Sequence, residues 1–185
     1  LLADTSRQLQ YYSCFKSLVR LRNRVPLLAW LGEWLLGLST RRQLPEPVAR
    51  SFEQRHQTDK TTSTTPAQTF IGEVVLLVDT FTNNFAPENA EAAIAVLQRA
   101  GYRVITARPD SMTPEPDRPL CCGRTHLANG MVDAARREAR RMLAVLWPHA
   151  EAGRPIIGLE PACLLAIRDD YRFLGLGRPA DQVAA

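Results

Sequence analysis

The sequence predicts an α/β protein with a small parallel sheet and flanking helices, preceded by an α-helical N-terminal arm. Two observations predict this class. After about residue 70, short apolar runs alternate with longer stretches in which apolar residues recur every three or four positions. Before that point the pattern is helical, and a polar stretch separates the two parts.

The N-terminal part, residues 1–52, is predicted to be a helical connector arm. Ser6 to Arg24 has apolar residues at helical spacing, and Val25 to Leu38 forms a second helical pattern. The second pattern contains Trp30 and Trp34 and is apolar around much of its circumference. We therefore expect it to pack on another domain or on a second copy of the chain.

A mobile polar linker is predicted over residues 53–69. From Gln54 to Gln68 the chain is rich in threonine and has no apolar periodicity. We place the domain boundary there, so that residues 70–185 form the α/β domain.

The first half of that domain has the pattern strand, helix, strand. Val74 to Val78 is a continuous apolar run, which is typical of a strand buried on both faces. A loop is predicted from Asp79 to Phe85, and a helix from Pro87 to Ala100 stops at Gly101. Tyr102 to Ala107 is the second strand.

The second half begins with a proline-rich loop, residues 108–120. A helix is predicted from His126 to Pro148 with a break near Gly130, followed by a strand from Pro155 to Leu159 and a helix from Pro161 to Tyr171. The solvated face of the long helix is predicted to carry Arg136, Arg137, Arg140 and Arg141.

Strands joined by helices in this order form a parallel sheet with right-handed crossovers, in a Rossmann-like three-layer arrangement. Ligands of such sheets bind beyond the carboxyl ends of the strands. Three loops leave those ends: one begins at Asp79, one carries Cys121 and Cys122, and one runs from Glu160 to Cys163. The topology therefore brings three of the four cysteines to one edge.

Thiolates near helix N-termini serve proteins as soft metal ligands and as nucleophiles. Cys163 follows Pro161 in the first turn of a predicted helix, whereas Cys14 lies on an apolar helix face and is interpreted as a packing residue. Three sulfurs with two carboxylates suit an iron–sulfur cluster or zinc. The candidate metal ligands are Cys121, Cys122, Cys163, Glu160 and Asp79. The supporting residues are Gly123, Arg124, Pro161 and His126. No residue is assigned a catalytic role.

Composition sets the remaining limits. The 185 residues are 45% hydrophobic and 23% charged, as in an ordinary soluble globular protein. The net charge of +4 arises in residues 1–68, with 10 basic and 5 acidic side chains, against 13 and 14 in residues 69–185. A basic arm can bind nucleic acid, but this one lacks interleaved aromatic side chains. A docking surface for an acidic neighbouring domain is the preferred interpretation.

The expected compartment is the cytoplasm, in solution or at the periphery of a membrane. Four cysteines are too few for a disulfide scaffold. No apolar run is long enough to span a bilayer, and the start lacks a secretory signal. The start also lacks a methionine, so we expect a piece of a longer protein.

The motifs together resemble the cysteine-rich CCG domain over about residues 70–180. They are Cys121-Cys122-Gly123-Arg124, Glu160-Pro161-Ala162-Cys163 and Asp79-Thr80-Phe81-Thr82. That domain occurs in heterodisulfide reductases, in the iron–sulfur subunits of glycolate oxidases and at the C-terminus of FAD-linked 2-hydroxy-acid dehydrogenases. The variants found here look most like the last group.

The resemblance implies a redox module that holds a metal or iron–sulfur cluster for electron transfer in an oxidoreductase acting on 2-hydroxy acids of the glycolate, lactate or 2-hydroxyglutarate type. It implies FAD and 4Fe-4S clusters in other parts of the full-length chain, whose flavin and ferredoxin-like domains would be partners. A second copy of the chain is a further candidate partner. The electron acceptor is not indicated.

The sequence departs from the cluster-binding pattern at two positions. Asp79 and Glu160 stand where such domains have cysteines. The fragment alone is therefore not expected to catalyse dehydrogenation, and a degenerate metal-free domain that serves docking or assembly is the alternative function.

Overall fold

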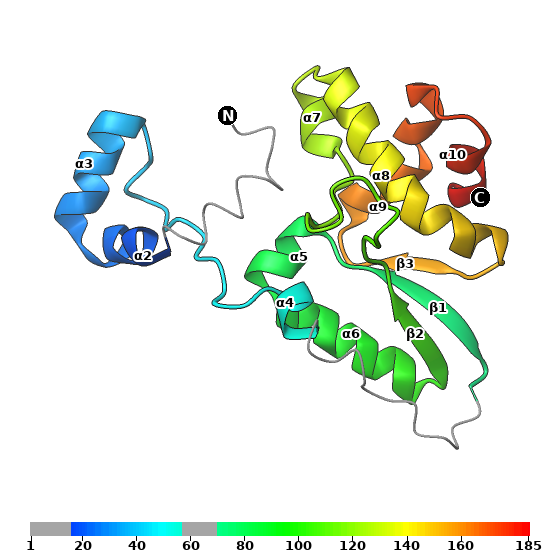
Figure 1. Cartoon of the computed structure of the whole chain (residues 1–185). Helices are drawn as coiled ribbons and strands as arrows, with labels where there is room; N and C mark the ends of the chain where they lie inside the picture. Colours follow the sequence, from blue (N-terminus) through cyan, green and yellow to red (C-terminus); the bar gives the residue numbers. More distant parts are fainter. Residues whose placement is uncertain (1–15, 57–69) are drawn as a thin grey trace.

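The computed structural model of the protein describes residues 16–56 and 70–185 (Figure 1). Its elements in chain order are α2 (Lys16–Arg24), α3 (Pro26–Leu36), α4 (Phe52–His56), β1 (Gly72–Leu77), α5 (Thr80–Phe85), α6 (Pro87–Arg99), β2 (Tyr102–Thr106), α7 (Arg124–Ala128), α8 (Val132–Glu151), β3 (Ile156–Gly158), α9 (Pro161–Arg168), the 3-10 helix η2 (Asp170–Leu174) and α10 (Arg178–Val183).

The three strands form a parallel sheet in the order β2-β1-β3. Val75 of β1 is in register with Ile105 of β2 on one side and with Ile156 of β3 on the other. The central strand is buried from Val74 to Leu77, as its continuous apolar run predicts. The predicted α/β class with a small parallel sheet is confirmed.

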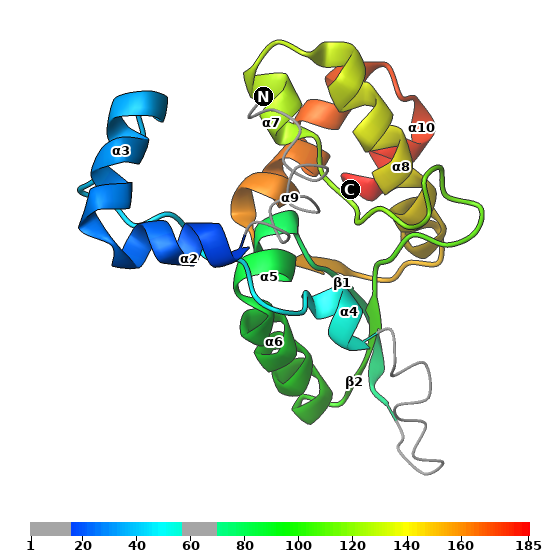
Figure 2. The same ribbon diagram turned by 60° about the vertical axis from the view of Figure 1, so that its left-hand side comes forward.

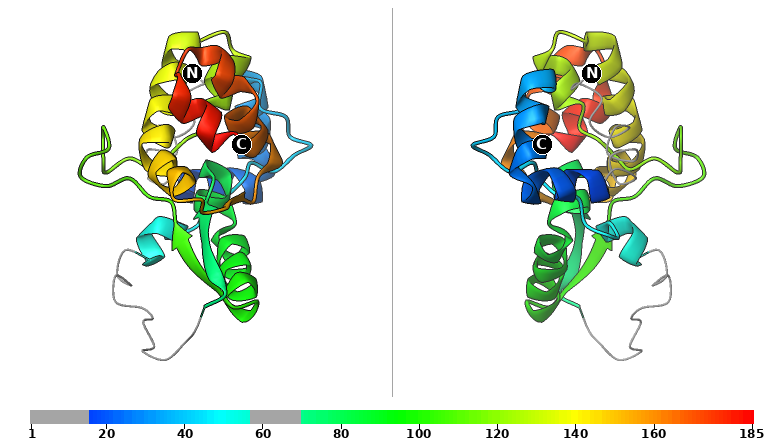
Figure 3. Two further views of the ribbon diagram at one scale, coloured as in Figure 1. Left: turned by 90° about the vertical axis from the view of Figure 1, so that its right-hand side faces the viewer. Right: turned by 90° about the vertical axis from the view of Figure 1, so that its left-hand side faces the viewer.

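Helices cover both faces of the sheet, which makes three layers (Figures 1 and 3). Alternate residues of β1 point to opposite faces because side chains alternate along a strand. Val75 and Leu77 pack with α8, α9 and α10, while Leu76 packs with α6 and with Phe52 of α4.

The arm formed by α2 and α3 extends away from the sheet and its helices (Figure 2). Arg22 of α2 holds the segment after α3 close to α2. Its guanidinium donates hydrogen bonds to the carbonyl oxygens of Leu38, Ser39 and Arg42. No side chain of α3 is buried. The predicted helix over residues 25–38 is thus present with its apolar surface exposed, while residues 6–15 of the first predicted helix, with Cys14, lie outside the described residues.

The connection between arm and sheet is only partly described, since residues 57–69 lie outside the described residues. Phe52 is buried against the sheet, and the backbone amide of Glu53 donates to Asn83 Oδ1. The division into arm, linker and α/β domain stays a prediction, although α4 packs with the α/β part.

The segment after β1 differs from the prediction. The sequence predicts a loop from Asp79 to Phe85, but Thr80–Phe85 forms α5. Asp79 begins this helix because its carboxylate accepts hydrogen bonds from the backbone amides of Phe81 and Thr82.

The long helical pattern is broken as predicted, since Gly130 separates α7 from α8. The predicted solvated arginine face is wrong at Arg141, which is 3% exposed. Its guanidinium pairs with Glu138 and donates to the carbonyl oxygens of Pro114, Glu115, Arg118 and Pro119. The proline-rich loop therefore lies over this face of α8 and buries it.

Glu138 is the centre of this buried network. It accepts from Arg118 at 2.7 and 2.9 Å and from Arg141 at 3.2 Å. Both guanidinium groups are buried with it, so the network attaches the loop before the cysteine pair to the middle of α8.

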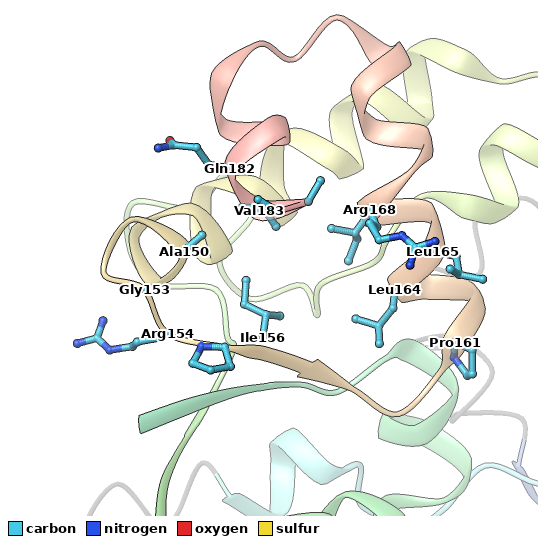
Figure 4. A pocket seen from close by; sticks show the side chains of 14 residues that line it. Ala150, Gly153, Arg154, Ile156, Pro161, Leu164, Leu165, Arg168, Gln182 and Val183 are labelled. Carbon is cyan, nitrogen blue, oxygen red and sulfur yellow. The ribbon is translucent and has the colours of Figure 1, made fainter. Parts of the chain in front are cut away.

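The C-terminal segment contains more helix than predicted. The helix expected through Tyr171 ends at Arg168, and η2 and α10 follow. A groove with a volume of about 690 Å³ lies between β3, α9, α10 and the end of α8, with Ile156, Leu164 and Val183 among its lining residues (Figure 4). No helix in the described parts of the chain combines the length and apolar character needed to cross a bilayer.

The buried network makes a first prediction. Glu138→Ala is expected to lower the free energy of unfolding by about 3–5 kcal/mol, because it removes the buried carboxylate that pairs with both Arg141 and Arg118, and Arg118 keeps Glu115 as a carboxylate partner. Urea unfolding measures this value. Glu151→Ala, at the exposed end of the same helix, is the control and is expected to change it by about 0.5 kcal/mol or less. Equal losses in the two variants would contradict the assigned role.

Candidate functional site: a cysteine cluster at the sheet edge

The three segments that follow the strands meet at one edge of the sheet, as the topology predicts. Cys122 and Cys163 come from segments 41 residues apart, and their sulfurs lie 3.0 Å from each other in a thiol–thiol hydrogen bond. Cys121, Cys122 and Cys163 are free thiols. The expectation that cysteines from the two motifs lie side by side is met by the Cys122–Cys163 pair.

The backbone at the cysteine pair is held from two sides. Tyr171, which is fully buried, donates its hydroxyl to the carbonyl oxygen of Cys122 at 2.9 Å. Gly123 follows with φ of 75°, a conformation that favours glycine, and α7 begins directly after it. A β-carbon on Gly123 would lie 3.1 Å from the carbonyl oxygen of Ala135 and 3.2 Å from Cβ of Glu138. The turn after the cysteines therefore depends on glycine for both its backbone conformation and its contact with α8.

Asp79 is used by the backbone next to it. One carboxylate oxygen accepts from the amides of Phe81 and Thr82, and the other accepts from the Thr82 hydroxyl at 2.5 Å. The residue is buried and does not line the cavity at the thiols. In this conformation Asp79 stabilises the start of α5.

Glu160 has a similar role at the start of α9, although it does line the cavity at the thiols. Its carboxylate accepts from the amide of Ala162 at 3.2 Å, and Pro161 occupies the first turn as predicted. Cys163 therefore lies in the first turn of a capped helix.

The thiols border a small cavity with a volume of about 150 Å³. Arg124 lines it, so this predicted supporting residue is near the sulfurs. His126 does not line it. The residues bordering the cavity are Thr80, Phe81, Cys121, Cys122, Arg124, Thr125, Glu160, Ala162 and Cys163.

Two of the thiols are held in the neutral form. Hydrogen bonding with Cys122, followed by burial, raises the pKa of Cys121 far above its ordinary range. For Cys122 the contact with Cys121 lowers the pKa, but the hydrogen bond with Cys163 and burial outweigh it and raise the pKa to about 12. Burial also raises the pKa of Tyr171. At neutral pH Cys121 and Cys122 are therefore protonated, buried thiols.

The side chains at this edge do not form a metal coordination shell as they are placed. Within residues 16–56 and 70–185, no three His, Cys, Asp or Glu side chains are grouped so that they could hold a metal ion. The two carboxylates cap helices, and the direct sulfur–sulfur contact between the two motifs is that of Cys122 with Cys163. Thiols are suitable ligands for a soft metal, but the side chains at this edge are not arranged as a coordination shell.

Sequence reasoning did not assign five residues to the site: Thr80, Phe81, Thr125, Ala162 and Tyr171. Thr80 and Phe81 line the cavity, and the prediction that a segment beginning at Asp79 reaches this edge could have found them. No local sequence pattern predicts the role of Tyr171, because its hydrogen bond with Cys122 joins residues 49 apart in the chain.

The chain is similar in sequence to part of a known dehydrogenase. Over 108 residues, 58% of this chain, the sequence is 33% identical to the D-2-hydroxyglutarate dehydrogenase of Pseudomonas putida. The matched region is 10% of that protein's length, so the similarity concerns a small part of a much longer chain. No family model matches the sequence, and no solved structure matches it.

The tight turn makes a second prediction. Gly130→Ala is expected to destabilise the protein by about 1–2 kcal/mol, because alanine disfavours the positive φ at this position. Gly123→Ala is expected to cost more, because its β-carbon would also crowd α8. Both glycines have φ near 70°, but a β-carbon at Gly130 meets nothing within 4 Å. Thermal or urea unfolding compares the pair, and equal destabilisation would show that contact with α8 is unimportant.

The thiol environments make a third prediction. Iodoacetamide at about pH 8 is expected to label Cys163 before Cys121 and Cys122, because the latter are buried with raised pKa values while Cys163 is partly exposed. Since the thiolate reacts, labelling of Cys122 should keep increasing as the pH rises toward about 12. Peptide mass spectrometry measures each site, and earlier labelling of Cys122 than of Cys163 would contradict the structure.

Proposed function

We propose that this chain is the cysteine-rich redox module of a larger oxidoreductase that joins flavin and ferredoxin-like iron–sulfur domains and acts on 2-hydroxy acids. The observation that carries the proposal is the meeting of Cys122 and Cys163 at the carboxyl edge of a parallel sheet. The similarity to part of a D-2-hydroxyglutarate dehydrogenase supports the context.

The proposed metal ligands are Cys121, Cys122 and Cys163: they would hold an iron–sulfur cluster as the redox centre, or zinc, which has no redox chemistry and would be structural. A bound cluster would supply one-electron transfer between the partner domains. Binding requires Cys121 to join the Cys122–Cys163 pair, and we propose Glu160 as the carboxylate ligand because it lines the same cavity. Arg124 borders the same cavity and would offset the negative charge of bound thiolates.

The experiment that tests the metal proposal is elemental analysis of the 185-residue chain purified without oxygen. The expected result is bound iron or zinc that is lost in Cys122→Ser and in Cys163→Ser. Cys14→Ser is the matched control and is expected to retain the metal. Metal-free protein with intact thiols would reject the ligand role.

The second candidate function, a metal-free module for docking or assembly, is favoured by the exposed arm. Trp30 and Trp34 of α3 are 58% and 72% exposed, and Leu27, Leu35 and Leu36 are exposed beside them. Exposed apolar surface of this kind marks interaction sites. The proposed contacts are the other domains of the same full-length protein.

This surface makes a fourth prediction. The isolated chain is expected to self-associate with rising concentration, because α3 then has no partner domain, and Trp30→Glu with Trp34→Glu should restore the monomer without loss of stability. Light scattering after size-exclusion chromatography measures the association, and urea unfolding measures the stability. Phe173→Glu, at an exposed site in the α/β part, is the control and is expected to leave association unchanged. A wild-type chain that stays monomeric at every concentration would contradict the prediction.

A further inference from the structure

A second cleft lies between the proline-rich loop, α7 and α8, and it shares no residue with the thiol cavity. Its volume is about 280 Å³. We propose that this cleft binds a small oxyanion, a molecule that presents a phosphate or carboxylate group. The proposal is independent of the metal, of the partner domains and of the function proposed above.

The charge of the cleft favours an anion. Four arginines and two glutamates line it. Glu138 is already engaged by Arg118 and Arg141, and Glu115 pairs with Arg118. Arg137 and Arg140 add two exposed guanidinium groups to the lining of the cleft, where they offer planar, bidentate donors to phosphate or carboxylate oxygens.

His126 provides an independent indication. Its side chain lines the cleft although the residue is only 5% exposed. Nδ1 is buried and has no hydrogen-bond partner among the described residues. Buried polar atoms are normally hydrogen-bonded, and an oxyanion in the cleft would accept a hydrogen bond from Nδ1 once the imidazole turns this atom toward the cleft.

The size and position of the cleft limit the ligand. A volume of about 280 Å³ lies at the lower end of the range for ligand pockets, which favours a small molecule over a nucleotide. The lining includes Glu115 and Arg118 of the loop that leads to Cys121. A bound anion would therefore contact the same loop that positions the thiols.

The test is isothermal titration calorimetry of the 185-residue chain at low ionic strength, with inorganic phosphate in one arm and glutarate in the other. Saturable binding in either arm is expected, and the stronger arm identifies the preferred group. Arg137→Gln with Arg140→Gln is expected to weaken binding at least about tenfold, the effect of losing charge-assisted hydrogen bonds. His126→Gln is expected to weaken it as well.

The matched control is Arg99→Gln with Arg172→Gln, which removes the same charge from exposed positions outside the cleft. It is expected to retain wild-type affinity. Thermal unfolding without ligand checks that each variant is folded, and the two double-arginine variants are expected to be folded because all four arginines are exposed. Absence of binding in both arms, or equal weakening by the control pair, would overturn the proposal.

Discussion

The buried carboxylate of Glu138 is the interaction on which the cysteine edge depends. It lies between Arg118 of the proline-rich loop and Arg141 of its own helix, and Arg141 also binds four carbonyl oxygens of that loop. A loop of this length has no regular backbone partners of its own, so its carbonyl groups need donors from elsewhere. One guanidinium supplies them, and the loop then ends at Leu120 with the cysteines at the sheet edge.

The same network explains why the turn at Gly123 is tight. Glu138 is not only the charge partner of the two arginines; its Cβ would also lie 3.2 Å from a β-carbon on Gly123, which is a close contact. The cysteine pair is thus fixed by α8 on one side and by the Tyr171 hydroxyl at Cys122 on another. Packing among α7, α8 and α9 brings Cys122 and Cys163 together.

Sequence alone predicts the fold and the edge, because these follow from local patterns. The apolar run at Val74 to Val78, the stop at Gly101 and the break at Gly130 are local signals, and parallel topology then places the cysteines together. The buried state of Arg141 escapes such reasoning because it depends on a loop that starts more than 30 residues earlier. The capping roles of Asp79 and Glu160 escape it for a different reason: a carboxylate that binds a metal and one that caps a helix use the same oxygens. Residue type alone does not separate the two roles.

The helix caps have a consequence for how such a domain changes over evolutionary time. Asp79 and Glu160 let α5 and α9 begin with internal hydrogen bonds, so the architecture does not need an ion to organise its helix starts. In proteins whose coordination shell is also their folding nucleus, loss of one ligand removes the fold along with the metal. Here the same two carboxylates that are candidate ligands also cap helices, so replacing Asp79 or Glu160 by alanine would cost about 0.5–2 kcal/mol of stability through the lost cap. If the thiols at this edge bind a metal as proposed, a lineage that carries this scaffold could lose the metal and still begin α5 and α9 from their own carboxylate caps.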